Sequence, residues 1–222
     1  MDKTARGWEV ATGDLLHVLE VPQLHVFISV AWSPDSAFVA TLSGDSNITV
    51  WDAATGVSVR VLEGPPTPKD WVMCVAWSPV GVMLAAAYDD HAVVVWNATT
   101  GTAIQVLRGP TIVCGMSLAW SPDGCHLAAA GQDAPDFSKM LAKMRSNLAE
   151  ISEDDGEKCV KVWEVATGTC VRVIPNAISV TCVAWSPCGN LLLTSMKGEL
   201  HVFNLGGGRL ATSPAVEAGW HM

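Results

Sequence analysis

The tripeptide Trp-Ser-Pro occurs four times in this chain, and its recurrence restricts the possible folds more than any other feature. The copies begin at Trp32, Trp77, Trp120 and Trp185. The first three copies are about 43 to 45 residues apart, and about 65 residues separate the last two. A period of roughly 40–45 residues is typical of repeat proteins whose unit is a small four-stranded sheet. A repeat architecture of this kind favours a binding function over a catalytic one.

A second landmark recurs with the same period. A β-branched or apolar run ends in an aromatic residue, which is followed by an acidic or amide residue: Trp51-Asp52, Trp96-Asn97, Trp163-Glu164 and Phe203-Asn204. An isolated copy, Gly7-Trp8-Glu9-Val10, stands near the N-terminus. Thr-Gly pairs follow every copy except the last. The chain therefore contains four complete units and one partial unit.

Each unit predicts short strands joined by turns. In the first unit we expect strands at 26–32, 38–42, 48–51 and 57–62, with Pro34 fixing φ in the first turn. The alanine-rich segments 84–87 and 127–130 would suggest a helix by propensity alone. They are shorter than two helical turns and are bounded by glycine-containing turns, so we predict strands there.

These motifs resemble those of the WD-repeat β-propeller family from Trp8 to about Leu210, apart from one insertion. The resemblance implies an all-β fold, a propeller or partial propeller of four-stranded antiparallel blades with one short helical insertion. It also implies a scaffold for partner proteins. We expect the recurring aromatic residues to pack between blades. The structural repeat residues that it identifies are Trp32, Trp51, Trp77, Trp96, Trp120, Trp163, Trp185 and Phe203, with the turn aspartates Asp45 and Asp90.

The chain departs from the family pattern in two respects. Gly64-Pro65 and Gly109-Pro110 stand where the family usually has Gly-His, and Glu157 and Lys197 replace the turn aspartate in the last two units. The buried His–Asp network of the family therefore cannot form. Because a satisfied polar network adds rigidity, we expect more modest stability than in close family examples.

The expected organisation is a partial repeat at residues 1–25, the end of a third strand plus a fourth strand, followed by four blades at residues 26–222. Rings of this family most often have seven blades. The chain is therefore a fragment of a longer protein, a chain that closes a small ring, or a chain that pairs with a second copy. An open row would leave strand edges available for self-association.

A helical and acidic insertion is expected at residues 132–158. Its apolar residues follow the i, i+3, i+4 spacing of an amphipathic helix, and an acidic run from Glu150 to Glu157 follows. One interpretation is that this helix docks a peptide or another subunit; the other is that it folds onto the propeller. The candidate partner-binding residues are Phe137, Met140, Leu141, Met144 and Leu148.

Composition narrows the classes of partner. The formal net charge of −9 argues against binding to nucleic acid or to an anionic membrane, so we expect proteins or peptides as partners. The seven cysteines include no Cys-x-x-Cys pair, and Cys74 and Cys182 lie in apolar strands. No long apolar run follows Met1, so no signal peptide is expected. These features favour reduced thiols in the cytoplasm, with the nucleus not excluded.

No residue pattern indicates catalysis. Asp89-Asp90-His91 is best explained as a turn, the other histidines lack metal-ligand spacing, and no nucleophile elbow or phosphate-binding loop is present. We therefore expect no cofactor, no metal site and no catalytic residue. The favoured function is a non-catalytic interaction scaffold. The alternative is a regulatory or sensor propeller domain cut from a larger signalling protein, and a hydrolase would need a catalytic triad elsewhere.

Overall fold

The computed structural model describes residues 4–20, 27–64, 72–88, 92–108, 113–132, 158–174, 180–195, 200–204 and 209–213. Within these ranges the chain forms β-strands joined by turns, and no helix is found there. The all-β fold expected from the sequence is therefore confirmed. The helix expected within 132–158 falls on residues 133–157, which lie outside the described residues. Residues 132 and 158 belong to the strands on either side.

The strands form one two-stranded sheet and four antiparallel four-stranded sheets, which we call blades one to four. The two-stranded sheet contains β1 (Thr4–Trp8) and β2 (Leu15–Glu20). Blade one contains β3 (Phe27–Trp32), β4 (Phe38–Ser43), β5 (Ile48–Asp52) and β6 (Ser58–Leu62). Blade two contains β7 (Val72–Trp77), β8 (Met83–Tyr88), β9 (Ala92–Asn97) and β10 (Ala103–Arg108). Blade three contains β11 (Val113–Trp120), β12 (His126–Gln132), β13 (Lys158–Glu164) and β14 (Thr169–Ile174). Blade four contains β15 (Val180–Trp185), β16 (Leu191–Ser195), β17 (Leu200–Phe203) and β18 (Arg209–Ser213).

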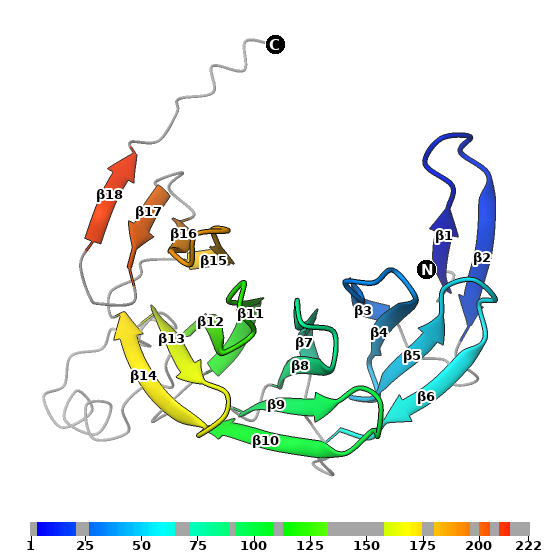
Figure 1. Ribbon diagram of the computed structural model, residues 1–222, viewed down its shortest axis with the longest axis horizontal. Helices are drawn as coiled ribbons and strands as arrows, with labels where there is room; N and C mark the ends of the chain where they lie inside the picture. Colours follow the sequence, from blue (N-terminus) through cyan, green and yellow to red (C-terminus); the bar gives the residue numbers. More distant parts are fainter. Residues whose placement is uncertain are drawn as a thin grey trace, which may run out of the picture.

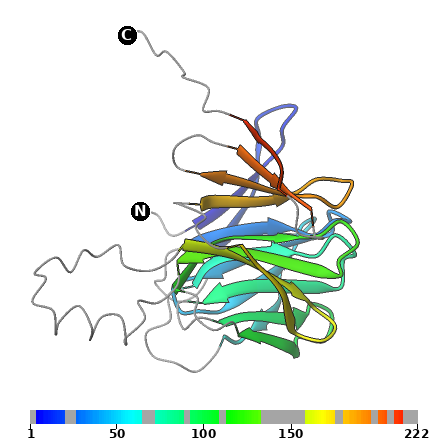
Figure 2. The same ribbon diagram turned by 90° about the vertical axis from the view of Figure 1, so that its left-hand side faces the viewer.

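The blades are arranged along an arc (Figure 1). The first strands of the blades, β3, β7, β11 and β15, contact one another in succession on the inner side of this arc. The fourth strands form the outer rim, and the side view shows the blades as successive layers (Figure 2). The arc is open between the two-stranded sheet and blade four, so the described strands do not form a closed ring.

Small residues allow neighbouring blades to pack closely. The three alanines of β8 and the three of β12 are almost fully buried, and they alternate between the cores on the two sides of their blade. The strand assignment of both alanine-rich segments is therefore confirmed. Tertiary packing overrides the helical propensity of alanine here, because larger side chains would not fit between two apolar sheets.

The Thr-Gly turns are where an outer strand of one blade contacts the next blade. Gly101 adopts a φ of 80°, which favours glycine, and a Cβ there would lie 3.0 Å from Arg60 Cδ. Arg60 of β6 donates from Nη1 to the Thr100 carbonyl at 3.1 Å. Gln105 of β10 donates to the Val165 carbonyl of blade three at 3.4 Å. The Thr-Gly landmark of the sequence thus marks a contact between blades.

Candidate protein-binding surfaces

A serine hydroxyl closes the Trp-Ser-Pro turns of blades one, three and four. Ser33 Oγ donates to Asp35 Oδ1 at 2.5 Å and accepts the backbone N–H of Phe38 at 2.9 Å. The turn at Ser121 and Asp123 repeats both bonds, and in blade two Val80 stands at the aspartate position. These hydrogen bonds lower the pKa of Asp35 and of Asp123, with the serine hydroxyl as the main cause. The serines are therefore structural, as the sequence predicted.

The tryptophans of these turns use their indole N–H groups within the protein. Trp120 Nε1 donates to the Ala76 carbonyl of blade two at 3.2 Å. Trp185 Nε1 donates to the Ala119 carbonyl of blade three at 3.0 Å. Trp77 Nε1 donates to Gly81 in its own turn, and the Trp77 ring stacks on Phe38 of blade one with centroids 6.4 Å apart. These three tryptophans therefore join neighbouring blades, as expected from their recurrence.

Trp32 differs from the other three tryptophans of this set. Its side chain is more than half exposed, although its repeat position predicts packing between blades. The physical reason is that no described first strand lies on the N-terminal side of β3, where the neighbouring blade would be. The expectation of interblade packing is therefore wrong for Trp32.

A shallow, open and mostly apolar cavity of about 530 Å³ lies where the turns of blades two, three and four meet. We call its lining the inner tryptophan–proline surface: Ala76, Trp77, Pro79, Leu118, Ala119, Trp120, Pro122, Trp185 and Pro187. The indole donors are already used, so the side chains offer rings and methylene groups rather than polar groups. The sequence analysis assigned these tryptophans to packing and did not predict a shared cavity. The signal was present in the proline that follows each Trp-Ser pair.

The tryptophans of the third strands have a structural role. Trp51, Trp96 and Trp163 are buried, and Phe203 packs against the core between blades three and four. Trp51 Nε1 donates to Thr41 Oγ1 at 2.7 Å. In the described part of the chain, the buried Trp163 Nε1 has no hydrogen-bond partner.

The turn before β5 keeps a small polar network. Asp45 accepts hydrogen bonds from Ser43 Oγ, at 2.5 Å, and from the Asn47 amide, at 3.0 Å. Asn47 Oδ1 in turn accepts the backbone N–H of Gly64 at 3.2 Å. Asp90 lies outside the described residues. Asp45 thus bonds to Ser43 and Asn47, two contacts that the sequence analysis did not predict.

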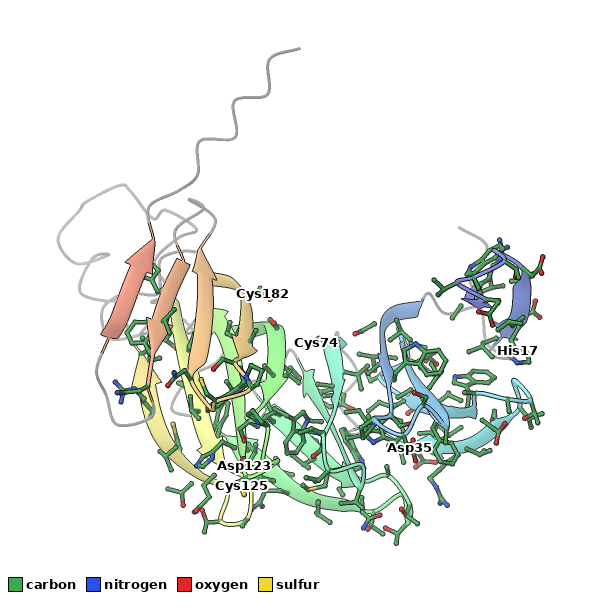
Figure 3. All side chains as sticks on the ribbon, turned by 45° about the horizontal axis from the view of Figure 1, so that its top comes forward. His17, Asp35, Cys74, Asp123, Cys125 and Cys182 are labelled. Carbon is green, nitrogen blue, oxygen red and sulfur yellow. The ribbon has the colours of Figure 1, made fainter. Side chains whose placement is uncertain are left out.

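Within the part of the chain that the structure describes, titratable groups do not converge on one site. Figure 3 shows them spread along the arc, with His17 in the two-stranded sheet, Asp35 in blade one, and Asp123 with Cys125 in blade three. Among the described residues, no group of three or more His, Cys, Asp or Glu could hold a metal ion. Asp89-Asp90-His91 lies outside those residues. The described residues also include no helix that is long and apolar enough to cross a membrane.

Two cysteines differ in chemistry. Burial raises the pKa of Cys74 to about 12, so its thiol stays protonated. Cys188 is exposed and stands at the aspartate position of the fourth turn, where Ser186 Oγ lies 3.0 Å from its Sγ. The Ser186 hydroxyl, followed by the Asn190 backbone N–H, lowers the pKa of Cys188. Cys74 thus behaves as a core residue, whereas Cys188 replaces a turn carboxylate.

The candidate partner-binding residues of the insertion lie outside the described residues: Phe137, Met140, Leu141, Met144 and Leu148. Their role stays a prediction.

Comparison with known proteins identifies the repeats. The family "WD domain, G-beta repeat" matches residues 13–52, 56–97, 101–134 and 168–204, which is more than half of the chain. Relatives named ribosome biogenesis protein BOP1 homolog, from Drosophila willistoni and Drosophila persimilis, are 45% identical over 40 residues. That stretch covers 18% of this chain and 5% of those relatives. The Drosophila erecta homolog is 55% identical over 31 residues, 14% of this chain and 4% of the relative. These alignments have about the length of one repeat, whereas the family matches recur along the chain. The chain belongs to the WD-repeat family.

Proposed function

We propose that this protein is a non-catalytic scaffold that binds partner proteins through the inner tryptophan–proline surface. The observation that carries the proposal is the cavity of about 530 Å³ lined by three tryptophans and three prolines from three successive blades. Aromatic residues are enriched where protein interfaces are buried, because they provide large apolar area with few rotatable bonds. Members of the WD-repeat family generally bind other proteins, which supports the same function.

The chemistry of the cavity favours an extended apolar segment as the bound element. Trp77, Trp120 and Trp185 have no indole N–H left to orient a polar ligand. Rings flanked by prolines instead form a ridged apolar surface, and aromatic-lined grooves of this kind accept proline-rich or extended peptides. The net charge of −9 favours a partner with neutral or basic residues around that segment. Nucleic acid and membranes are not the proposed partners, and the proposed location is cytoplasmic.

The test compares partner capture by the wild-type chain and by charged variants of the cavity. Pro122 and Pro187 are exposed on the lining, so the double substitution Pro122→Glu and Pro187→Glu places charge in the cavity. Loss of two turn prolines costs about 0.4–1 kcal/mol each, which a thermal melt will check. The matched control is Val171→Glu, an equally apolar-to-acidic change at an exposed position of β14.

In quantitative affinity purification, we expect the double variant to fail to capture a defined set of the partners that the wild-type chain captures. The Val171→Glu control should still capture that set. If both variants retain the same partners, the inner tryptophan–proline surface is not the binding site. Deleting residues 135–155 in a parallel experiment tests the insertion, whose role as a partner-docking helix remains a second prediction. Catalytic turnover in a broad activity screen would contradict the non-catalytic assignment.

A further inference from the structure

The three turns around the inner tryptophan–proline surface differ at one repeat position. The residue that follows the proline is valine in blade two, aspartate in blade three and cysteine in blade four: Val80, Asp123 and Cys188. Residues 77–83, 120–126 and 185–191, which form these turns, include no lysine or arginine. When His126 is neutral, Asp123 therefore carries the one formal charge of the three turns.

The turn of blade three uses one oxygen of the Asp123 carboxylate. Oδ1 accepts the Ser121 hydroxyl at 2.5 Å and the backbone N–H of Cys125 at 2.9 Å. Among the described residues, no group donates a hydrogen bond to Oδ2. The Asp123 side chain is exposed, next to Pro122 of the cavity lining. A cationic group of a ligand can therefore pair with Oδ2 while the bonds of the turn stay in place.

The space beside Asp123 is open towards the next blade. In the preceding pair of turns, a Cβ at Gly124 of blade three would lie 2.9 Å from Val80 Cγ2 of blade two, so these turns contact each other. Gly189 holds the equivalent place in blade four, where the repeat sets it against Asp123. A Cβ at Gly189 would meet no described atom within 4 Å. A ligand group can therefore enter between the turns of blades three and four.

The neighbouring tryptophan favours an arginine as that group. Trp185 is partly exposed in the cavity lining, and its indole N–H already donates to the Ala119 carbonyl at 3.0 Å. The indole therefore offers a ligand an aromatic surface rather than a donor, and guanidinium groups are attracted to such surfaces. Arginine combines a planar cation that stacks on rings with donors that pair with carboxylates, whereas lysine is a strongly hydrated point charge. The carboxylate and the ring together thus fit arginine.

The backbone of these turns offers a ligand few free donors. The first N–H group of each turn and that of its glycine donate to carbonyls of the same turn: Ser78, Gly81, Ser121, Gly124, Ser186 and Gly189. Addition of a strand therefore has little to bond to here. A segment without N–H groups loses least when it packs on apolar rings, and proline has none. Proline-rich segments are also extended before they bind, so that less conformational entropy is lost.

We propose that the inner tryptophan–proline surface binds a proline-rich segment that carries an arginine, and that Asp123 selects this segment by its charge. The prolines of the segment pack on the rings of the lining. The guanidinium group lies between the turns of blades three and four and pairs with Asp123 Oδ2. This inference rests on the proposed function and adds to it the class of segment and the residue that determines its charge. An acidic residue in place of the arginine is disfavoured by repulsion from the same carboxylate.

The probe is a labelled peptide with capped termini and the sequence Arg-Pro-Pro-Leu-Pro-Pro-Arg. Arginine stands at both ends so that either orientation of the segment brings one to Asp123. Two control peptides have alanine or glutamate in place of both arginines. Binding to the full chain is measured by fluorescence anisotropy at about pH 8, where free histidine is neutral. An ionic strength of about 0.15 M screens charges that lie more than roughly 8 Å away.

Three variants change the charge at the one repeat position. Asp123→Asn removes the carboxylate and keeps an oxygen for the bonds of the turn. Cys188→Asp adds a carboxylate to the turn of blade four, where Ser186 Oγ, 3.0 Å from the cysteine Sγ, can donate to it. Asp35→Asn is the matched control, because Asp35 accepts the same two bonds in its turn but no residue of blade one lines the cavity (Figure 3). Thermal melts check that each variant is folded.

We expect the arginine peptide to bind the wild-type chain about two- to fivefold more tightly than the alanine peptide, the range that one exposed ion pair provides. The glutamate peptide should bind more weakly than either. Asp123→Asn should abolish the preference for arginine over alanine, whereas Asp35→Asn should retain it. Cys188→Asp should increase the preference, because it places a second carboxylate beside the cavity.

Four outcomes overturn the inference: no binding of any peptide, equal affinity for the arginine and alanine peptides, a preference that survives Asp123→Asn, and a preference that is lost in Asp35→Asn. None of them decides the proposed function, which the capture experiment tests without assuming a ligand. If the arginine peptide binds the Pro122→Glu and Pro187→Glu double variant as tightly as the wild type, the peptide site lies elsewhere and the inference fails as well. The two failures are therefore distinguishable.

Discussion

The hydrogen bond between Trp51 and Thr41 contributes to the stability of the fold, and its removal can be tested. Thr41 Oγ1 accepts from Trp51 Nε1 at 2.7 Å, and both side chains are buried. Thr41→Val removes the acceptor and keeps the volume, so the indole N–H is left unsatisfied in the core. Leaving a buried donor without a partner costs about 1–3 kcal/mol, and we expect the free energy of unfolding to fall by that amount.

The equivalent position in blade three is Ala129. Val39 pairs with Trp51 and Leu127 pairs with Trp163, and Thr41 and Ala129 each lie two residues further along their strand. The lack of a hydroxyl there explains why Trp163 Nε1 has no partner within the described residues. Ala129→Ser supplies one with a small increase in volume. We expect a gain of about 0.5–1.5 kcal/mol, the net worth of one hydrogen bond.

The assay is urea unfolding followed by circular dichroism. Because m-values are about 1–3 kcal/mol per molar urea, these changes shift the midpoint by a few tenths of a molar or more, in opposite directions. Ala128→Ser is the matched control, since Ala128 is buried in the core on the other side of the blade and its added hydroxyl should destabilise. A neutral Thr41→Val, or an Ala129→Ser that destabilises as much as Ala128→Ser, would refute the assignment of these acceptors.

Three further predictions concern the turns and the inner tryptophans. At neutral pH a thiol reagent should modify Cys188 before the buried Cys74, whose raised pKa keeps it protonated; mass spectrometry of timed samples checks the order. Because the pKa of Asp123 is lowered, its ionised carboxylate stabilises the fold at pH values above 3.8, the pKa of an ordinary aspartate. This stabilisation is lost as the pH falls below that value. Urea melts at about pH 5 and about pH 3 should therefore show a larger loss for the wild type than for Asp123→Asn. Trp120→Ala should cost about 3–5 kcal/mol, whereas Trp32→Ala at an exposed site should cost far less, as thermal melts will show.

The repeat period predicted most of the fold. In the first unit the strands expected at 38–42 and 48–51 agree with β4 and β5 to within one residue, because turns with serine, proline and glycine define where each strand ends. The alanine-rich segment 84–87 was assignable to a strand from its length and its flanking turns. Local turn chemistry and periodicity agree here with the final packing, which is why the sequence is sufficient.

The environment of individual tryptophans could not be read from the repeat. Trp32 and Trp120 occupy the same repeat position, yet only Trp120 has a neighbouring first strand to cover it. Thr41 was likewise not recognised, because its role depends on the indole that lies across the sheet from it. The Trp-Ser-Pro tryptophans come together at one cavity only after three blades are placed side by side. These features depend on contacts between units, which a motif within one unit does not encode.

Among the described residues, the hydrogen bonds between blades connect each blade with its immediate neighbours. The indole of Trp120 reaches the blade before it, and the hydroxyl of Ser117 receives an N–H from the blade after it. In such a linear array a local defect weakens the adjacent units most, and its influence declines with distance along the row. The terminal units have a neighbour on one side and should therefore unfold first. Blade two, in the middle of the row, should unfold last and refold before the terminal units. Cooperativity in this protein is therefore transmitted along the arc, from blade to blade, rather than across it.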